Sequence, residues 1–269
     1  MTRLEGAHVL ITGAASGLGR LLALGAAARG ARLTLLDRNA EGLQAVWEEL
    51  AGAPAGEAAV WTVDLADRAA LQAVAGRVLA TRGPVDILIN NAGVVNGLHL
   101  LEGSDAAIER TFQVNTLALF WTARAFLPAM IRQGRGHVAT IASAAGLGGT
   151  SRLTDYCASK FAAVGFDESL RQELRRLGHP VRTTVVCPWY IATGMFRGAS
   201  TRWPRLLPIL RPEYVARRIL AAVAADRRRL ILPRFVLAVL LVRCLPPDLS
   251  DAVLRCFGVD RSMDGFSGR

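Results

Sequence analysis

Short apolar runs alternate with longer amphipathic stretches along most of the chain. The runs are rich in β-branched residues, and most are followed by ten or more residues with the apolar spacing of a helix. Seven runs predict strands at 8–12, 32–36, 58–63, 86–90, 136–143, 181–186 and 229–233. The helical patterns cover 17–29, 39–51, 67–81, 107–132, 156–177 and 212–225. This order predicts an α/β fold, in which a doubly wound, seven-stranded parallel sheet carries helices on both faces.

The alternation continues without a linker, which predicts a single domain. Pro212 stands where a helix should begin, and Gly30 and Gly83 stand where two others should end. A chain of 269 residues is long enough for one large core. We therefore expect one domain over residues 1–234, followed by a C-terminal extension over residues 235–269.

The positive charge is concentrated in the last quarter of the chain. Residues 1–196 carry 18 basic and 16 acidic groups, whereas residues 197–269 carry 14 basic and 6 acidic groups. The basic residues of the second part alternate with leucine, isoleucine, valine and tryptophan, which favours an anionic membrane surface over a DNA groove. A solvated arginine-rich face is the alternative. We expect no nucleic-acid binding.

The longest apolar run of that region, FVLAVLLV at 235–242, is far shorter than the roughly 20 residues that a membrane-spanning helix needs. The chain opens without a secretory segment. Its four cysteines form no C-x-x-C motif, and its four histidines show no ligand spacing. We expect a cytoplasmic protein with reduced thiols, no metal site, no signal peptide and no transmembrane span. If it touches a membrane, residues 197–245 are the region that would do so.

A glycine-rich turn, TGAASGLG at 12–19, joins the first predicted strand to the first predicted helix. Gly13, Gly17 and Gly19 permit a tight turn that brings backbone N–H groups and the helix N-terminus close to a pyrophosphate. Such a triplet is specific only in the context of a βαβ unit, which this chain supplies. The turn predicts a Rossmann-type dinucleotide-binding domain.

Asp37 ends the second predicted strand. A carboxylate there can accept hydrogen bonds from the adenosine ribose and would repel a 2′-phosphate, so NAD is favoured over NADP as the cofactor. Arg38 follows directly and could attract that phosphate. A purely structural role, with Asp37 capping the next helix, is the other alternative.

Lys160 is the only lysine, in a chain that has 31 arginines. It follows Tyr156 by four residues on a predicted helix, so the two side chains share a face. Oxidation of an alcohol needs a base for the hydroxyl proton, and a nearby ammonium would lower the pKa of the phenol from about 10. Such pairs also arise by chance on helices, so the pair indicates a catalytic site only together with the glycine turn.

Ser143 ends the fifth predicted strand, at the edge where parallel sheets bind their ligands. Its hydroxyl could bond a substrate oxygen. Thr140, Thr150 and Ser151 could take the same role as far as residue type goes, and spacing to Tyr156 favours Ser143.

These motifs follow one another in a specific order: TGAASGLG, then NNAG at 90–93, Asn115, Ser143 and YCASK at 156–160. Together they resemble the short-chain dehydrogenase/reductase superfamily over essentially the whole chain. The segments FWTARAFLPAM, CPWYIATGMFRG and FGVDRSMDGFSGR resemble more narrowly the branch of retinol dehydrogenase 10 and of the retinal reductase called short-chain dehydrogenase/reductase 3.

The resemblance implies roles for individual residues. Tyr156 would act as general base or acid, Lys160 would hold the cofactor ribose and favour phenolate, Ser143 would bond the substrate oxygen, and Asn115 would hold a water linking Lys160 to solvent. Cofactor contacts are implied for Gly13, Ser16, Gly17, Leu18, Gly19, Asp37, Asp64, Leu65, Asn91, Ala92, Gly93, Tyr156, Lys160, Pro188, Ile191 and Thr193. The superfamily commonly forms homodimers or homotetramers, through helices that correspond here to 107–132 and 156–177.

The superfamily carries its substrate lid at the place of residues 195–210. Six apolar residues stand in this stretch: Phe196, Trp203, Leu206, Leu207, Ile209 and Leu210. We therefore expect an NAD-dependent dehydrogenase or carbonyl reductase for a lipophilic alcohol, such as a retinoid, a steroid or a fatty alcohol. An NADPH-dependent ketoacyl-type reductase and a non-catalytic dinucleotide-binding scaffold are the alternatives.

Overall fold

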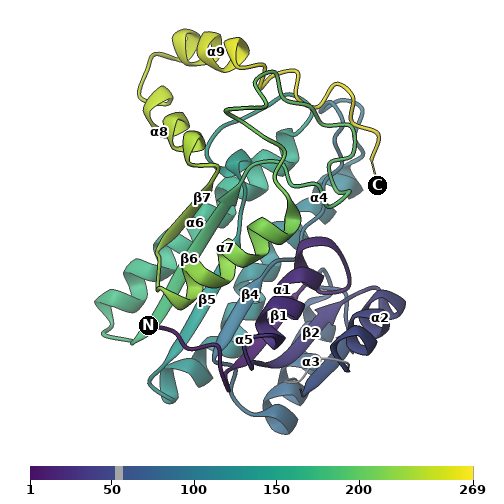
Figure 1. Ribbon diagram of the computed structural model, residues 1–269, viewed down its shortest axis with the longest axis vertical. Helices are drawn as coiled ribbons and strands as arrows, with labels where there is room; N and C mark the ends of the chain where they lie inside the picture. Colours follow the sequence, from purple (N-terminus) through teal and green to yellow (C-terminus); the bar gives the residue numbers. More distant parts are fainter. Residues whose placement is uncertain (52–56, 269) are drawn as a thin grey trace.

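The computed structural model describes residues 1–51 and 57–268. Within them a seven-stranded parallel sheet has the strand order β3-β2-β1-β4-β5-β6-β7 (Figure 1). The strands are β1 (His8–Thr12), β2 (Arg32–Asp37), β3 (Ala58–Thr62), β4 (Ile87–Asn90), β5 (Gly136–Ile141), β6 (Val181–Pro188) and β7 (Arg229–Leu232). The strand order reverses between β1 and β4, and a ligand-binding crevice is expected at the carboxyl ends of strands around such a reversal. The predicted fold class is confirmed.

Helices cover both faces of the sheet. One core packs α1 (Gly17–Ala27), α2 (Ala40–Ala51) and α7 (Pro212–Ala224) against it, and the other side carries α3 (Arg68–Arg82), α5 (Ala118–Arg132) and α6 (Thr154–Arg176). Because successive strand residues point to opposite faces, Val9 and Ile11 belong to one core cluster and Leu10 to another. This double burial explains why the strands read as continuous apolar runs rather than as alternating ones.

The helix expected over 107–132 is interrupted. It consists of α4 (Asp105–Phe112), a single turn of π-helix (Gln113–Leu117) and α5. Among the described residues, the stretch Asp105–Arg132 is long and apolar enough to cross a membrane by length and composition, with a mean hydropathy of 1.3. More than half of its apolar window, 56%, is buried inside the protein. That burial is typical of a core helix.

The C-terminal extension packs onto the rest of the molecule. A 3-10 turn (Arg234–Leu237) leads into α8 (Ala238–Val242) and α9 (Pro247–Cys256). Figure 1 shows both helices beyond the carboxyl end of β7, and the chain after them returns across the loops above the sheet. Met263, near the end of the chain, is fully buried. The extension is therefore part of one folded body as far as Gly268, and its last residue, Arg269, lies outside the described part.

Candidate active site

The glycine turn has the geometry that only glycine permits at its centre. Gly13 has a φ of +66°, and a Cβ placed on it would lie 2.7 Å from the Cα of Ala92. A Cβ on Gly19 would lie 1.9 Å from the carbonyl oxygen of Gly13. The turn therefore packs directly against the segment after β4 and against its own helix, and any side chain at these positions would push them apart.

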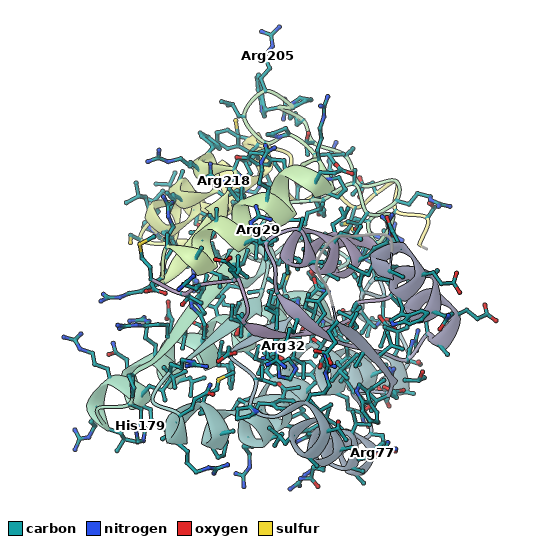
Figure 2. All side chains as sticks on the ribbon, turned by 60° about the horizontal axis from the view of Figure 1, so that its bottom comes forward. Arg29, Arg32, Arg77, His179, Arg205 and Arg218 are labelled. Atoms are coloured by element: carbon teal, nitrogen blue, oxygen red, sulfur yellow. The ribbon has the colours of Figure 1, made fainter. Side chains whose placement is uncertain are left out.

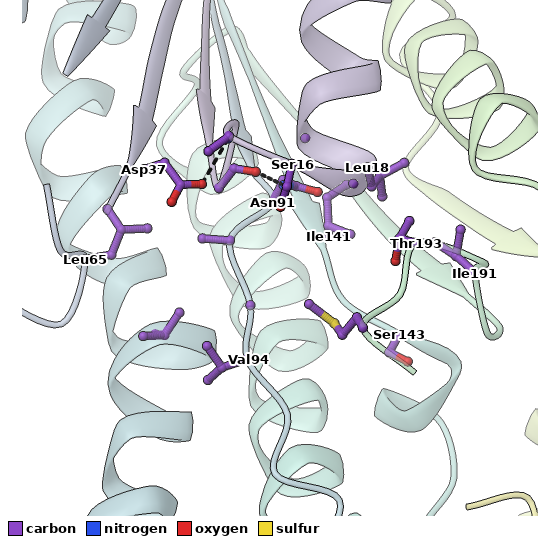
Figure 3. Close-up of a pocket in the computed structure, with 18 of the residues that line it drawn as sticks. Ser16, Leu18, Asp37, Leu65, Asn91, Val94, Ile141, Ser143, Ile191 and Thr193 are labelled. Atoms are coloured by element: carbon purple, nitrogen blue, oxygen red, sulfur yellow. Dashed lines mark hydrogen bonds between the residues drawn. The ribbon is translucent and has the colours of Figure 1, made fainter. Parts of the chain in front are cut away.

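Asn91 fastens the segment after β4 to this turn. Its Nδ2 donates to the carbonyl oxygens of Thr12 and Gly13, both at 3.0 Å. The Thr12 hydroxyl oxygen accepts from the backbone N–H groups of Asn91 and Ala92. The amide of Asn91 is therefore committed to holding the two loops together (Figure 3).

A cavity of about 520 Å³ runs along the carboxyl ends of the strands. Figure 3 shows Asp37 and Leu65 on one side of the glycine turn, and Ile191 and Thr193 on the other. The structure brings together in its lining every residue to which the resemblance assigned a cofactor contact: Gly13, Ser16, Gly17, Leu18, Gly19, Asp37, Asp64, Leu65, Asn91, Ala92, Gly93, Tyr156, Lys160, Pro188, Ile191 and Thr193. Ser143 lines it too.

Hydrogen bonds hold the two carboxylates at one side of the cavity, Asp37 and Asp64, in place. One oxygen of Asp37 accepts from the Ala15 N–H and the other from the Asn39 N–H, both at 3.0 Å. Asp64 bonds the Arg110 guanidinium at 2.8 Å. Partial burial alone would raise the pKa of the Asp64 carboxyl, but Arg110 and a backbone N–H outweigh it and lower that pKa. The Asp64 carboxyl is therefore charged at neutral pH, and both side chains stand where a ribose and a purine could bind.

The catalytic candidates Tyr156 and Lys160 share the inner face of α6, and both are almost fully buried. The Lys160 Nζ donates to the carbonyl oxygen of Ile141 at 2.9 Å and lies 5.7 Å from the centroid of the Tyr156 ring. Burial lowers the pKa of Lys160 to about 8. The shared face expected from their spacing is thus observed.

The prediction that Lys160 lowers the pKa of Tyr156 is wrong for this structure. Burial raises it, and a hydrogen bond with Ser143 only partly opposes that effect. The ammonium of Lys160 donates to a backbone carbonyl, and burial of the phenol outweighs the effects that lower its pKa. The phenol is therefore protonated at neutral pH in this state.

Ser143 lies just beyond β5, which ends at Ile141, and so does not end the strand as expected. Its hydroxyl oxygen accepts from the Ala145 N–H at 3.1 Å and caps a turn of 3-10 helix (Ala144–Gly146). A serine that caps a turn competes with continued pairing in the sheet. The same cap places the hydroxyl beside the phenol of Tyr156.

Asn115 lies in the π-turn and outside the lining of the cavity. Its Oδ1 accepts from the Val94 N–H at 2.8 Å, and its Nδ2 donates to the Val94 carbonyl oxygen and to the Ser159 hydroxyl, both at 3.0 Å. A Cβ on Gly93 would lie 3.4 Å from this Oδ1 and 3.5 Å from the Lys160 Nζ. Asn115 and the ammonium of Lys160 therefore both lie next to Gly93.

A second, apolar cavity of about 80 Å³ adjoins the first. The two share Ser143, Tyr156, Trp189 and Phe196. Its far wall comes largely from the C-terminal extension: Phe235, Val236, Ala238, Val239, Val242, Val253, Leu254, Phe257 and Val259. Sequence reasoning did not assign these residues to the site, although Val253, Leu254 and Phe257 have the spacing of one helical face.

The apolar residues of the lid divide into three groups. Phe196 and Leu207 line the apolar cavity. Trp203, Leu206 and Ile209 are between 43% and 46% exposed instead, and Leu210 is buried where Ile191 and Leu210 form an isolated bridge. Of the six apolar residues of the stretch, Phe196 and Leu207 therefore line the apolar cavity.

The large cavity fits a nicotinamide dinucleotide. It combines a glycine turn at a helix N-terminus, a carboxylate at the end of β2 and a buried phenol and ammonium in one continuous lining. Within the described residues, no group of three or more histidine, cysteine, aspartate or glutamate side chains could hold a metal ion. The arrangement suits hydride transfer beside a proton-transferring phenol.

Known proteins resemble this chain in sequence and fold. Residues 7–203 match the family model described as short chain dehydrogenase. The chain is 45% identical over 266 residues to short-chain dehydrogenase/reductase family 16C member 6 of Bos taurus, over 98% of this chain and 84% of that protein. It is 40% identical over 285 residues to retinol dehydrogenase 10 of Xenopus tropicalis, over 96% of this chain and 84% of that protein.

Solved structures agree with these relatives. A short chain dehydrogenase/reductase from Burkholderia phymatum in complex with NAD has a TM-score of 0.83 and 29% identity, covering 95% of this chain and 97% of that chain. A metagenomic short-chain oxidoreductase in complex with NADP has a TM-score of 0.72 and 34% identity, covering 86% of this chain and 98% of that chain. The resemblance drawn from the motifs is confirmed, and both dinucleotides occur among the similar structures.

Proposed function

This chain belongs to the short-chain dehydrogenase/reductase family, as an oxidoreductase that uses a nicotinamide dinucleotide, and from that premise we propose that it transfers a hydride between NAD(H) and a lipophilic alcohol or its carbonyl. The observation that carries the proposal is the position of Ser143 and Tyr156, which line both the large cavity and the apolar cavity. A substrate oxygen between these hydroxyls would have its carbon facing the dinucleotide and its hydrocarbon part in the apolar cavity.

The proposed chemistry divides between the cofactor and the chain. The dinucleotide would accept or supply the hydride, held by the glycine turn, Asp37 and the segment that contains Ile191 and Thr193. The Tyr156 oxygen takes the proton of the alcohol during oxidation, and its O–H returns a proton to the carbonyl oxygen during reduction. The Ser143 hydroxyl donates to the same oxygen as charge develops on it.

Lys160 and Asn115 support the phenol in this proposal. Because burial raises the pKa of Tyr156, oxidation requires a neighbouring positive charge that favours phenolate, and the ammonium of Lys160 is the one on the same face of α6. Asn115 holds the Val94 backbone and Ser159 in α6, and so keeps the loop after β4 at a fixed distance from that ammonium.

The apolar cavity supports a lipophilic substrate. Of the residues that line it, Ser143, Thr150, Tyr156, Trp189 and Tyr190 carry a polar side-chain atom, and the others are aliphatic, phenylalanine or glycine. A sugar or polyol would bind weakly in such a cavity, because its hydroxyls would lose their hydrogen bonds to water and find few partners in the lining. A panel of retinoid, steroid and fatty alcohols, assayed with NAD and NADP side by side, tests reaction, cofactor and substrate class together.

The preference for NAD is proposed on the charge of Asp37. Exchange of this residue for serine keeps one hydroxyl for the Ala15 or Asn39 N–H and removes the negative charge, while Arg38 remains in the lining. We expect the ratio of kcat/KM with NADP to that with NAD to rise about 10- to 100-fold in Asp37→Ser, which corresponds to about 1.4 to 2.8 kcal/mol. Steady-state kinetics with both dinucleotides measures the ratio.

The matched control for this change is Asp105→Ser, an exposed carboxylate on α4. A ratio that stays the same in both variants would show that Asp37 does not select the dinucleotide, and would favour the NADPH-dependent alternative.

Contact with an anionic membrane is proposed for the side of the molecule formed by the lid and α8. The inner side of α8 lines the apolar cavity with Val239 and Val242, whereas Leu241 on its outer side is 75% exposed. The same two segments and the turn before α8 expose arginines, among them Arg205, Arg234 and Arg243. Figure 2 shows Arg205 at the top of the view and His179 toward its lower left. Exposed apolar side chains in segments that also expose arginines suit an anionic bilayer.

The protein is therefore expected to co-sediment with anionic liposomes at low salt and to detach as salt rises. Leu241→Glu should weaken this binding about 10-fold, since burial of a leucine is worth about 1.5 to 3 kcal/mol. Leu177→Glu, with an exposed leucine two residues before His179, is the control. If neither the unsubstituted protein nor the control binds liposomes, the basic region is a solvated face.

Self-association is also proposed through α5 and α6. The π-turn and α5 leave Leu117 and Phe120 more than 40% exposed, and Phe120 contacts Phe166 of α6 with ring centroids 4.9 Å apart. An apolar surface spanning two neighbouring helices suits a homodimer or homotetramer interface. Light scattering of the purified protein measures the state.

A further inference from the structure

A chain of aromatic contacts leads away from the candidate catalytic phenol. The Phe196 ring meets the Tyr156 ring edge to face, with centroids 5.5 Å apart, and meets the Tyr190 ring in the same way at 5.1 Å. Phe196 lines both cavities, whereas Tyr190 lines only the apolar one. The position of Phe196 therefore shapes the space beside the phenol, and Tyr190 helps to set that position.

Tyr190 is in turn held by the end of the chain. Its hydroxyl lies 2.9 Å from the Oγ of Ser262, and both residues are buried. The Ser262 hydroxyl donates to the Val259 carbonyl oxygen at 2.7 Å, so it accepts from Tyr190. A residue 72 positions away in the sequence thus fixes the orientation of the ring that packs on Phe196.

The segment that carries Ser262 is firmly seated. We call residues 259–267 the C-terminal strap. At its start the Thr150 hydroxyl donates to the Val259 carbonyl oxygen at 2.5 Å, and at its end the Ser267 N–H donates to the Arg197 carbonyl oxygen at 3.1 Å. Met263 is fully buried in the cluster that contains Tyr156 and Tyr190.

Two glycines allow the strap to pack closely against its neighbours. A Cβ on Gly198 would lie 1.8 Å from the carbonyl oxygen of Gly265, and a Cβ on Gly97 would lie 2.2 Å from the ring of Phe266. The two glycines have φ values of +85° and +69°. The strap thus passes between the lid and the loop after β4 at distances that no other residue at these positions would allow.

We propose that the C-terminal strap is a positioning element of the active site, in which Ser262 acts through Tyr190 and Phe196 to set how a lipophilic substrate lies against Tyr156. The proposal rests on the proposed function. It makes Ser262 and Tyr190 specificity-determining residues for bulky substrates, which extend from Tyr156 toward the apolar cavity, and leaves compact substrates much less affected.

Ser262→Ala and Tyr190→Phe test the proposal, since each removes one hydroxyl and leaves the other residue and both backbones in place. Retinol serves as the long probe and cyclohexanol as the compact one. We expect each variant to lower the ratio of kcat/KM for retinol to that for cyclohexanol about 5-fold, and the dissociation constant of retinol, followed by fluorescence quenching, to rise by a similar factor. The affinity for the dinucleotide should not change.

The double variant gives the sharpest result. Both substitutions break the hydrogen bond between Tyr190 and Ser262, and Ser262→Ala also removes the bond to the Val259 carbonyl oxygen. The effect of the double variant should therefore equal that of Ser262→Ala alone rather than the product of the two single effects. Ser267→Ala, with an exposed serine on the same strap, is the matched control. Equal losses for retinol and cyclohexanol, multiplicative effects in the double variant, or unfolding of both single variants would each overturn the proposal in favour of a merely structural strap.

The binding measurement separates this inference from the proposed function. In one outcome the unsubstituted enzyme turns over no alcohol of the panel but binds retinol, and the single variants weaken that binding without multiplicative effects in the double variant. The proposed reaction then fails, and the strap stands as a binding element. If the enzyme oxidises retinol and the variants leave the two ratios unchanged, the reaction stands and the strap proposal fails.

Discussion

Tyr156→Phe is expected to lower kcat for the lipophilic alcohol by about 10²- to 10⁴-fold, the range that general acid–base catalysis contributes. The substitution keeps the ring that packs on Phe196 and the cluster around Met263, and removes only the oxygen that accepts or donates the proton. The affinity for the dinucleotide should change by no more than about 2-fold, as expected when an interaction made in the transition state is lost. Steady-state turnover and a separate binding titration measure the two quantities.

Tyr214→Phe provides the control, because Tyr214 lies on α7 and lines neither of the two cavities described. Unchanged NADH turnover in Tyr156→Phe would refute the assignment of the base. Dinucleotide binding without turnover in the unsubstituted protein would instead favour the non-catalytic scaffold.

Lys160→Arg is expected to lose activity by about 10²-fold or more, although it keeps the positive charge. The ammonium donates to the Ile141 carbonyl oxygen in a space bounded by Gly93, where even a Cβ would come within 3.5 Å of the Nζ. A planar guanidinium is wider and more rigid than an ammonium and cannot rotate its donors between partners. It would displace the loop after β4 or move away from Tyr156.

The pH dependence of activity in the unsubstituted enzyme and in Lys160→Arg adds a second readout. Burial lowers the pKa of Lys160 to about 8, so the contribution of the charged ammonium is fully present well below that pH and is lost as pH rises through it. The residual activity of Lys160→Arg should lack this alkaline loss, since a guanidinium stays protonated. Arg175→Lys, at an exposed position on the same helix, is the control. Near-normal kcat in Lys160→Arg would show that charge alone suffices at this position.

Much of the fold follows from local signals that are specific in sequence. The turn at Gly13 and Gly19 could be predicted because its backbone geometry excludes every other residue, and the parallel sheet could be predicted because strands buried on both faces are apolar throughout. The cavity lining followed because a βαβ unit determines which loop ends meet at the edge of the sheet.

The features that escaped prediction depend on contacts between distant segments. The pKa direction of Tyr156 is set by burial under Phe196 and Met263, and the residue spacing carries no information about that burial. Leu210 is buried at a bridge with Ile191, and the far wall of the apolar cavity comes largely from α8 and α9. The burial of Tyr156 leaves no periodic signal in the sequence, and the helical spacing of Val253, Leu254 and Phe257 predicts an apolar face but not what that face packs against.

The π-turn between α4 and α5 makes this part of the chain sensitive to its length rather than to its composition. A π-turn accommodates one residue more than an α-helical turn, so everything beyond Leu117 is rotated relative to a straight continuation of α4 by about 100°, the angle of one α-helical residue. Deletion of one residue from 113–117 would restore a regular helix and gain backbone hydrogen bonds, yet it would turn Asn115 or the core face of α5 away from its partners. Conservative substitutions along the same helix would leave that alignment intact.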